Sequence, residues 1–211
     1  MTNFVPIFPL GIVVYPGEAL NLHIFEPRYK QLIADCIEKG QPFGIPPVIE
    51  NQVGDMGTLV SVKEVSRRYD NGEMDIKTEG VQVFRMLEVI KTIPDKLYSG
   101  AIVNYPENNR QGHAGLMEKL VSGIRRLHGL LNTGKKFDMP PSGICSYDIA
   151  HHAGLTLQQE YELLQLLHEL QRQEYLKQHL ARAIPLVEQL ESMKEKIRLN
   201  GHFKNLPGFE W

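Results

Sequence analysis

The stretch LHIFEPRY at residues 22–29 joins an extended segment to the first helix of the chain. Pro27 suits the first turn of a helix, where its missing N–H group breaks no hydrogen bond. Apolar residues then recur every three or four positions across residues 29–37, which places them on one helix face. Gly40 is a natural stop, because glycine readily takes the left-handed conformation that ends helices. The pattern predicts a helix over residues 26–39.

Around this helix the first half of the chain has the pattern of a β structure. Apolar and polar residues alternate in several short runs, which is typical of strands with one buried face. Asn71-Gly72 predicts a tight hairpin, because both residues tolerate positive φ angles. Several short strands within about 105 residues favour a small barrel. The expected strands cover residues 4–10, 19–24, 57–65, 73–79, 81–90 and 98–103.

The pattern changes to helical after the polar stretch at residues 105–112, so we expect domains at 1–107 and 108–211. Thr156 and Gln159 form a capping-box pair, which predicts a helix start. A second cap is expected at Ser146. The expected helices cover residues 113–131, 147–153, 157–167 and 171–199, the last kinked at Pro185. The fold class is therefore α+β, a β barrel with one early helix followed by a helical bundle.

Composition restricts the classes of function. The chain has 211 residues, of which 42% are hydrophobic and 23% charged, as in ordinary soluble globular proteins. A formal net charge of −2 gives no general attraction to nucleic acid or anionic membranes. The sequence has the pattern of neither a signal peptide nor a membrane span. We expect a cytoplasmic protein.

Motifs for catalysis and cofactor binding are incomplete. Residues 129–135 have the glycine and lysine spacing of a phosphate loop, but Lys136 stands where Ser or Thr should bind magnesium. The eight histidines have no metal-ligand spacing. Cys145 with His151 or His152 could be imagined as a catalytic dyad, but closeness in sequence is poor evidence for pairing in space. We expect no enzyme and no cofactor.

Five residues are candidates for binding. Arg67 and Arg68 stand beside the hairpin, where they could meet an anion or remain on a solvated edge. Glu26 can accept backbone N–H bonds at the helix start, and Arg28 stands on the other side of Pro27. Tyr29 belongs to the apolar helix face. A role in fixing the helix against the barrel is favoured for this second group over direct ligand contact.

Four segments together resemble the N-terminal domain of Lon proteases. They are FPLGIVVYPG at 8–17, LHIFEPRY at 22–29, VGDMGTL at 53–59 and DIKTEG at 75–80. The resemblance implies a PUA-like pseudobarrel followed by a helical bundle, and a role in recognising protein substrates. The 211 residues show no ATPase or Ser-Lys peptidase motif of a full protease, so we expect no catalysis of that kind. Residues 81–85 also depart from the arginine-rich segment common in full-length members.

The leading hypothesis is a non-catalytic protein- or peptide-binding module, with its groove between barrel and helices. The resemblance implies unfolded or partly folded protein segments as partners, and a separate protease as a further partner. The first alternative is RNA binding by the PUA-like barrel, against which the near-neutral charge argues. The second is a small-molecule enzyme or sensor with a pocket in the barrel. We expect no membrane partner.

Overall fold

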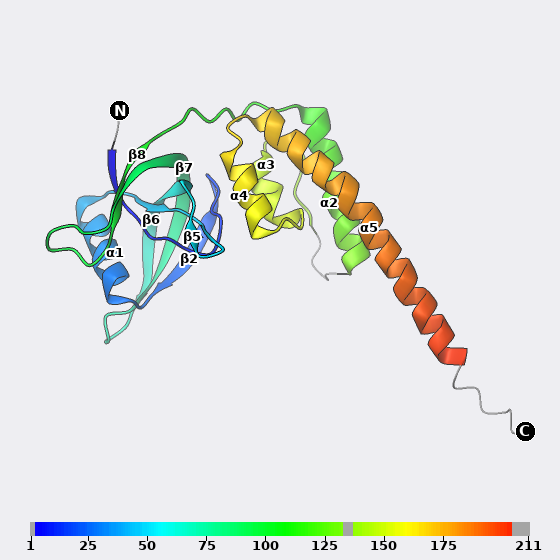
Figure 1. Cartoon of the computed structure of the whole chain (residues 1–211), viewed down its shortest axis with the longest axis horizontal. Helices are drawn as coiled ribbons and strands as arrows, with labels where there is room; N and C mark the ends of the chain where they lie inside the picture. The colour runs from blue at the N-terminus through cyan, green and yellow to red at the C-terminus, as the bar shows by residue number, and fades with distance from the viewer. Residues whose placement is uncertain (1–2, 133–136, 204–211) are drawn as a thin grey trace, which may run out of the picture.

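The computed structural model describes residues 3–132 and 137–203, with side chains up to 198. Figure 1 shows a β barrel at one end, a group of helices beside it, and one long helix that extends away from both. The predicted α+β architecture is confirmed. The division at residues 107 and 108 stays a prediction.

The barrel is built on one sheet with strand order β1-β8-β7-β6-β3. It closes where Ile7 forms a parallel bridge to Gly44, and β2 pairs separately with β7. The long strands β6 and β7 form the predicted hairpin. The short strands β3, β4 and β5 were not predicted. The strands are β1 Asn3–Pro6, β2 Ala19–Ile24, β3 Phe43–Ile45, β4 Val48–Ile49, β5 Gln52–Val53, β6 Met56–Arg68, β7 Met74–Ile90 and β8 Gly100–Asn104.

Gly80 lies inside a continuous β7 and does not separate two strands. The turn at residues 15–18 docks on it: Gly17 donates to the Gly80 carbonyl at 2.8 Å, and Gly80 donates to Glu18 at 2.8 Å. A Cβ atom at Gly80 would clash with the Tyr15 carbonyl. Only glycine therefore allows this turn to approach the strand so closely.

Helix α1, Pro27–Lys39, closes one side of the barrel. Pro27 stands at its start, and Gly40 ends it at φ 60°, as predicted. The buried side chains Leu32, Ile33 and Cys36 pack with barrel residues such as Phe43 in a single apolar cluster. The alternation of the strands and the helical period of α1 therefore meet in one core.

The second half is helical, with α2 Ala114–Leu131, α3 Ser146–Ile149, η1 Ala150–His152, α4 Leu157–Gln165 and α5 Glu169–Phe203. The capping box of Thr156 and Gln159 forms as predicted. The predicted cap at Ser146 is wrong: Cys145 is the N-cap of α3, because the Ser146 hydroxyl is committed to Glu169. Helix α5 continues past Pro185. None of the described helices has the length and apolar character needed to cross a bilayer.

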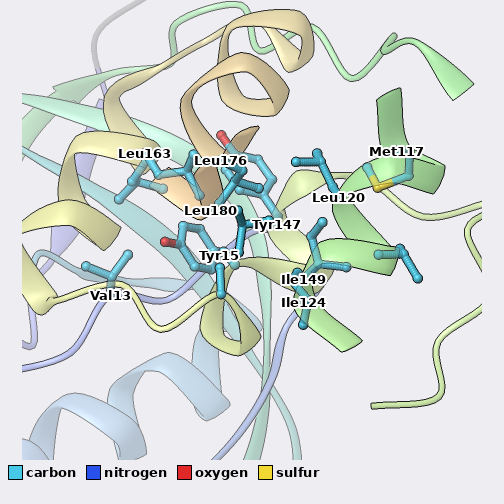
Figure 2. Close-up of a cluster of buried hydrophobic side chains, with 14 of the residues drawn as sticks. Val13, Tyr15, Met117, Leu120, Ile124, Tyr147, Ile149, Leu163, Leu176 and Leu180 are labelled. Atoms are coloured by element: carbon cyan, nitrogen blue, oxygen red, sulfur yellow. The ribbon is translucent and has the colours of Figure 1, made fainter. Parts of the chain in front are cut away.

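Barrel and helices share a hydrophobic core (Figure 2). Val13 and Tyr15 from the barrel side lie among helical side chains such as Tyr147, Leu163 and Leu176. The rings of Tyr15 and Tyr147 stack with centroids 5.1 Å apart. Continuous packing across the junction holds the two halves in one arrangement.

Polar contacts across the junction add direction to this packing. The Tyr161 hydroxyl donates to Asp55 at 2.5 Å and accepts the Met56 amide at 3.2 Å. His151 lies between two carboxylates, 2.7 Å from Glu160 and 3.1 Å from Glu18. Burial alone would lower the pKa of His151, but hydrogen bonds and charge from Glu160 and Glu18 outweigh it and raise the pKa to about 9.

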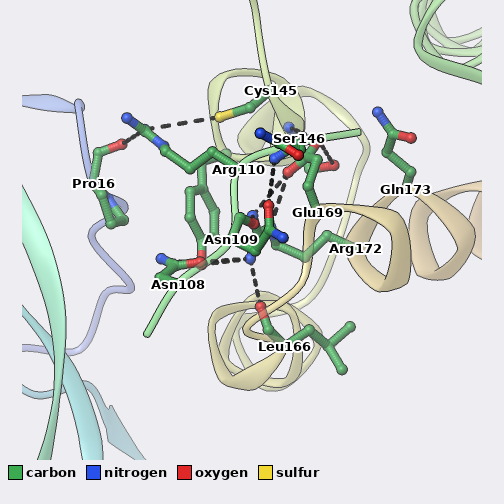
Figure 3. A network of polar contacts seen from close by, with 12 residues as sticks. Pro16, Asn108, Asn109, Arg110, Cys145, Ser146, Leu166, Glu169, Arg172 and Gln173 are labelled. Carbon is green, nitrogen blue, oxygen red and sulfur yellow. Dashed lines mark hydrogen bonds and ion pairs between the residues drawn. The ribbon is translucent and has the colours of Figure 1, made fainter. Parts of the chain in front are cut away.

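A buried arginine organises the helices (Figure 3). Arg172 is fully buried, and it pairs with Glu169 through Nε at 3.0 Å and Nη2 at 2.9 Å. Its other N–H groups donate to the oxygens of Asn108 (2.9 Å), Tyr147 (3.1 Å), Leu166 (2.6 Å) and Asn109 (2.9 Å). Glu169 also accepts both the amide and the hydroxyl of Ser146. One ion pair thus joins four parts of the chain: the segment between the two halves, α3, the end of α4 and the start of α5.

Replacing Arg172 with Met should strongly destabilise the protein. The change leaves the Glu169 carboxylate buried without its partner, which costs about 3–5 kcal/mol in comparable sites. Urea unfolding followed by circular dichroism measures this loss. The control is Lys63→Met, which removes an exposed ion pair with Glu79 and should cost under about 1 kcal/mol. Equal losses in the two variants would contradict the assigned role of Arg172.

His151 should make stability depend on pH. Its folded pKa of about 9 lies above the ordinary value of 6.5, so its contribution is complete below pH 6.5 and is lost as pH rises toward 9. We expect the Tm difference between the wild type and His151→Gln to shrink across that range. Thermal melts of both proteins at matched ionic strength measure it. A difference that stays constant, or grows with pH, would show that the carboxylates do not hold the charged imidazole.

Candidate functional site

Three of the predicted binding residues lie at the start of α1. The carbonyl of Glu26 accepts the amides of Tyr29 and Lys30. Its carboxylate accepts Arg28 at 2.8 Å, so the prediction that this side chain would accept backbone N–H groups is wrong. Tyr29 is buried, and its ring stacks on Phe8 with centroids 3.8 Å apart. Arg28 lies over the same ring at 4.5 Å. These contacts join the helix start to the barrel wall.

Arg67 and Arg68 lie at the same end of the barrel. Strand pairing places Arg68 opposite Met74, which in turn pairs with Ile24, two residues before Glu26. The guanidinium of Arg67 lies 4.6 Å from the ring centre of Tyr69. The structure therefore brings the five predicted residues to one region, but their role in binding stays a prediction.

A polar cluster that sequence reasoning missed lies beside them. His23 contacts Asp75 at 2.7 Å and Glu73 at 3.3 Å, and the Tyr69 hydroxyl donates to Asp75 at 2.8 Å. The hydrogen bond with Asp75 raises the pKa of His23. Only the pairing of β2 with β7 sets His23 opposite Asp75, so no local pattern could have revealed the cluster. The carboxylates oppose phosphate binding at this end.

Neither thiol lies in surroundings that would activate it as a nucleophile. Burial raises the pKa of Cys36 to about 11 and also raises that of Cys145, so both thiols stay protonated near neutral pH. Both ring nitrogens of His151 face carboxylates. Gly129 of the phosphate-loop-like segment lies in α2, and residues 133–136 fall outside the described residues. Within the described ranges, no three or more His, Cys, Asp or Glu side chains lie together in a way that could hold a metal ion.

The helical half carries a groove between α2 and α5, which we call the α2–α5 groove. It has a volume of about 290 Å³, with mainly apolar side chains on its floor and basic side chains on its rim. Its lining residues are Lys119, Leu120, Gly123, Arg126, Lys177, Leu180, Ala181, Ile184 and Pro185.

Gly123 determines the shape of this groove. A Cβ atom there would lie 3.1 Å from the Leu180 side chain, which is tighter than ordinary packing. The missing side chain lets the two helices approach and leaves a hollow above Leu180. No local sequence signal identifies the groove, because Gly123 and Leu180 are distant in the chain.

The rim of the α2–α5 groove carries positive charge. Arg126 pairs with Glu188 at 2.6 Å, and Lys177 pairs with Glu174 at 2.9 Å. Lys119 is exposed and makes no ion pair with any residue in the described ranges. An apolar floor beside an unmatched cation suits a segment that carries an apolar and an acidic side chain.

The comparisons with known proteins agree with this architecture. The crystal structure of a Lon N-terminal domain protein from Xanthomonas campestris matches with a TM-score of 0.63 at 21% identity, covering 82% of this chain and 96% of that one. The N-terminal domain of the Lon protease of the Mycobacterium avium complex matches with a TM-score of 0.62 at 14% identity, covering 85% and 99%. At these identities the likeness shows the fold. It confirms the predicted Lon N-terminal fold.

A family model identifies the lineage of the sequence itself. The model of the ATP-dependent protease La (LON) substrate-binding domain matches residues 5–198, nearly the whole length. The resemblance carried by residues 8–17, 22–29, 53–59 and 75–80 is thereby confirmed. The chain belongs to the LON substrate-binding domain family.

Proposed function

We propose that this protein is a non-catalytic recognition module that binds unfolded or partly folded protein segments in the α2–α5 groove. Membership of a substrate-binding family supports the general role. The observation that carries the proposal is the groove itself, where an apolar floor at Leu120 and Leu180 lies beside the cations of the rim. Such a surface accepts a large apolar side chain and selects its polar neighbours by charge.

The groove differs in place from the one expected between barrel and helices. At that junction Val13 and Tyr15 are packed tightly among helical side chains. On the α2–α5 groove, by contrast, Ala181 and Pro185 stay exposed. We therefore assign binding of protein segments to the outer side of the helical half.

RNA binding is not favoured by the region around Arg67 and Arg68. The carboxylates of Glu73 and Asp75 lie beside them, next to His23. An approaching phosphate backbone would meet these negative charges together with the positive ones.

Ala181→Phe should block the groove. Ala181 is exposed and lines the groove, so the larger ring fills the space above the floor without entering the core. We expect binding of a permanently unfolded probe, reduced and carboxymethylated α-lactalbumin, to weaken roughly tenfold, as for loss of one central contact. Fluorescence anisotropy with the labelled probe measures the affinity.

The matched control is Gln171→Phe, which adds the same ring at an exposed position of α5 outside the groove. It should bind the probe within about twofold of the wild type, since surface changes away from the contact have small effects. Circular dichroism melts check that both variants are folded. Unchanged affinity in Ala181→Phe, or a wild type that does not bind the probe, refutes the assignment of the groove.

A further inference from the structure

The second half of α5 projects beyond the helix that supports its first half. Contacts with α2 run from the bond between the His113 amide and Gln173 to the ion pair of Arg126 with Glu188. After Glu188 the helix continues to Phe203, which is roughly 22 Å at 1.5 Å per residue, and Figure 1 shows this part extending away from the other helices. A lone helix of this length is marginal in water, so a partner that packs on it would stabilise it.

One face of the projecting part is apolar. Leu186 is 58% exposed, Leu190 49%, Met193 59% and Ile197 69%. Their spacing of four, three and four residues keeps them within about 60° of one another at about 100° per residue. We call these residues the α5 stripe. A solvated helix would normally carry polar residues on such a face.

The α5 stripe continues a face that is already covered in the first half of the helix. At about 100° per residue, Tyr175 and His179 lie in line with the stripe. Tyr175 donates to Glu162 of α4 at 2.8 Å, and His179 contacts the Ala153 carbonyl at 3.0 Å. Within the chain, this face is therefore contacted by a carboxylate of α4 and by the backbone carbonyl that follows η1, and the same face stays open beyond them.

The charges around the α5 stripe are sorted by side. On the helical projection, Lys194 and Lys196 flank the stripe at about 80° on either side. Glu188, Glu191 and Glu195 all lie more than about 120° away. Lys194 pairs with Glu191 at 2.7 Å, whereas Lys196 makes no ion pair in the part of the chain that the structure describes. The open face is apolar with positive margins.

We propose that the α5 stripe is the docking surface for an amphipathic helix of another protein, with Asp or Glu on both margins of its apolar face. This surface is separate from the α2–α5 groove.

A second copy of the chain fits the α5 stripe less well than such a helix. An antiparallel pair would set Lys194 beside Val187 and Lys196 beside Gln189, and a parallel pair would set Gln189 beside Lys194. Neither arrangement gives the lysines an opposite charge.

The probe is a synthetic helical peptide with leucines at the same four-three spacing and Glu on both margins, titrated into the full chain by calorimetry. A second peptide carries Lys at the margins instead. We expect the Glu peptide to bind and the Lys peptide to bind at least tenfold more weakly. Leu190→Asp should abolish binding of the Glu peptide. Lys196→Glu should weaken the Glu peptide about tenfold and strengthen the Lys peptide, a reversal that loss of folding cannot produce.

Two controls separate this proposal from others. Leu170→Asp changes a leucine of α5 that is 56% exposed but lies outside the stripe, and it should leave binding unchanged. Ala181→Phe blocks only the groove, so this variant should also bind the Glu peptide with unchanged affinity. Failure of the groove proposal can therefore be distinguished from failure of the α5 stripe proposal. Equal binding of both peptides, or unaltered binding in Leu190→Asp, overturns the proposal. So does a wild-type dimer that Leu190→Asp converts to monomer, or binding to phosphatidylglycerol vesicles in place of the peptide.

Discussion

The buried ion pair of Arg172 with Glu169 is the constraint on which the helical half depends. A guanidinium removed from water must have its N–H groups matched, and here the oxygens that match them come from Asn108, Asn109, Tyr147 and Leu166. Since these oxygens belong to separate segments, the segments must meet at one point. Apolar packing is less directional and would tolerate several arrangements of the same helices. The ion pair therefore selects one of them.

The arrangement that this ion pair selects also sets the position of the groove and of the contacts between helices and barrel. Because the start of α5 is held at Glu169, its first half lies along α2, and the close approach at Gly123 forms the groove above Leu180. On the other side, α4 presents Tyr161 to Asp55 and Met56 of the barrel. The turn at residues 15–18 also joins the barrel to the helices, and Gly80 allows this turn to lie close to β7. The position of the outer surfaces follows from contacts in the interior.

The chain belongs to the LON substrate-binding domain family, and two surfaces of the helical half, the α2–α5 groove and the α5 stripe, suit different kinds of protein partner. The α2–α5 groove is small, with a mainly apolar lining and a basic rim, which suits one anchoring side chain. The α5 stripe is long and open, which suits a whole helix. In our proposals a protein segment and a helical partner would occupy different parts of α5, so one helix could hold both at once.

The sequence alone determined what depends on near neighbours. Pro27 and Gly40 bounded the first helix, Asn71-Gly72 placed the hairpin, and Thr156 with Gln159 began α4, because these signals act within about four residues. The four family segments also identified the fold. The tertiary structure decided what depends on distant residues. It showed Ser146 bonding Glu169 where a helix cap was expected, and it set His23 beside Asp75. It also placed Gly123 against Leu180. Whether a polar residue is buried with partners or exposed to water depends on chain segments far away in sequence. The sequence pattern alone therefore does not distinguish Arg172 from an ordinary polar residue on a helix surface.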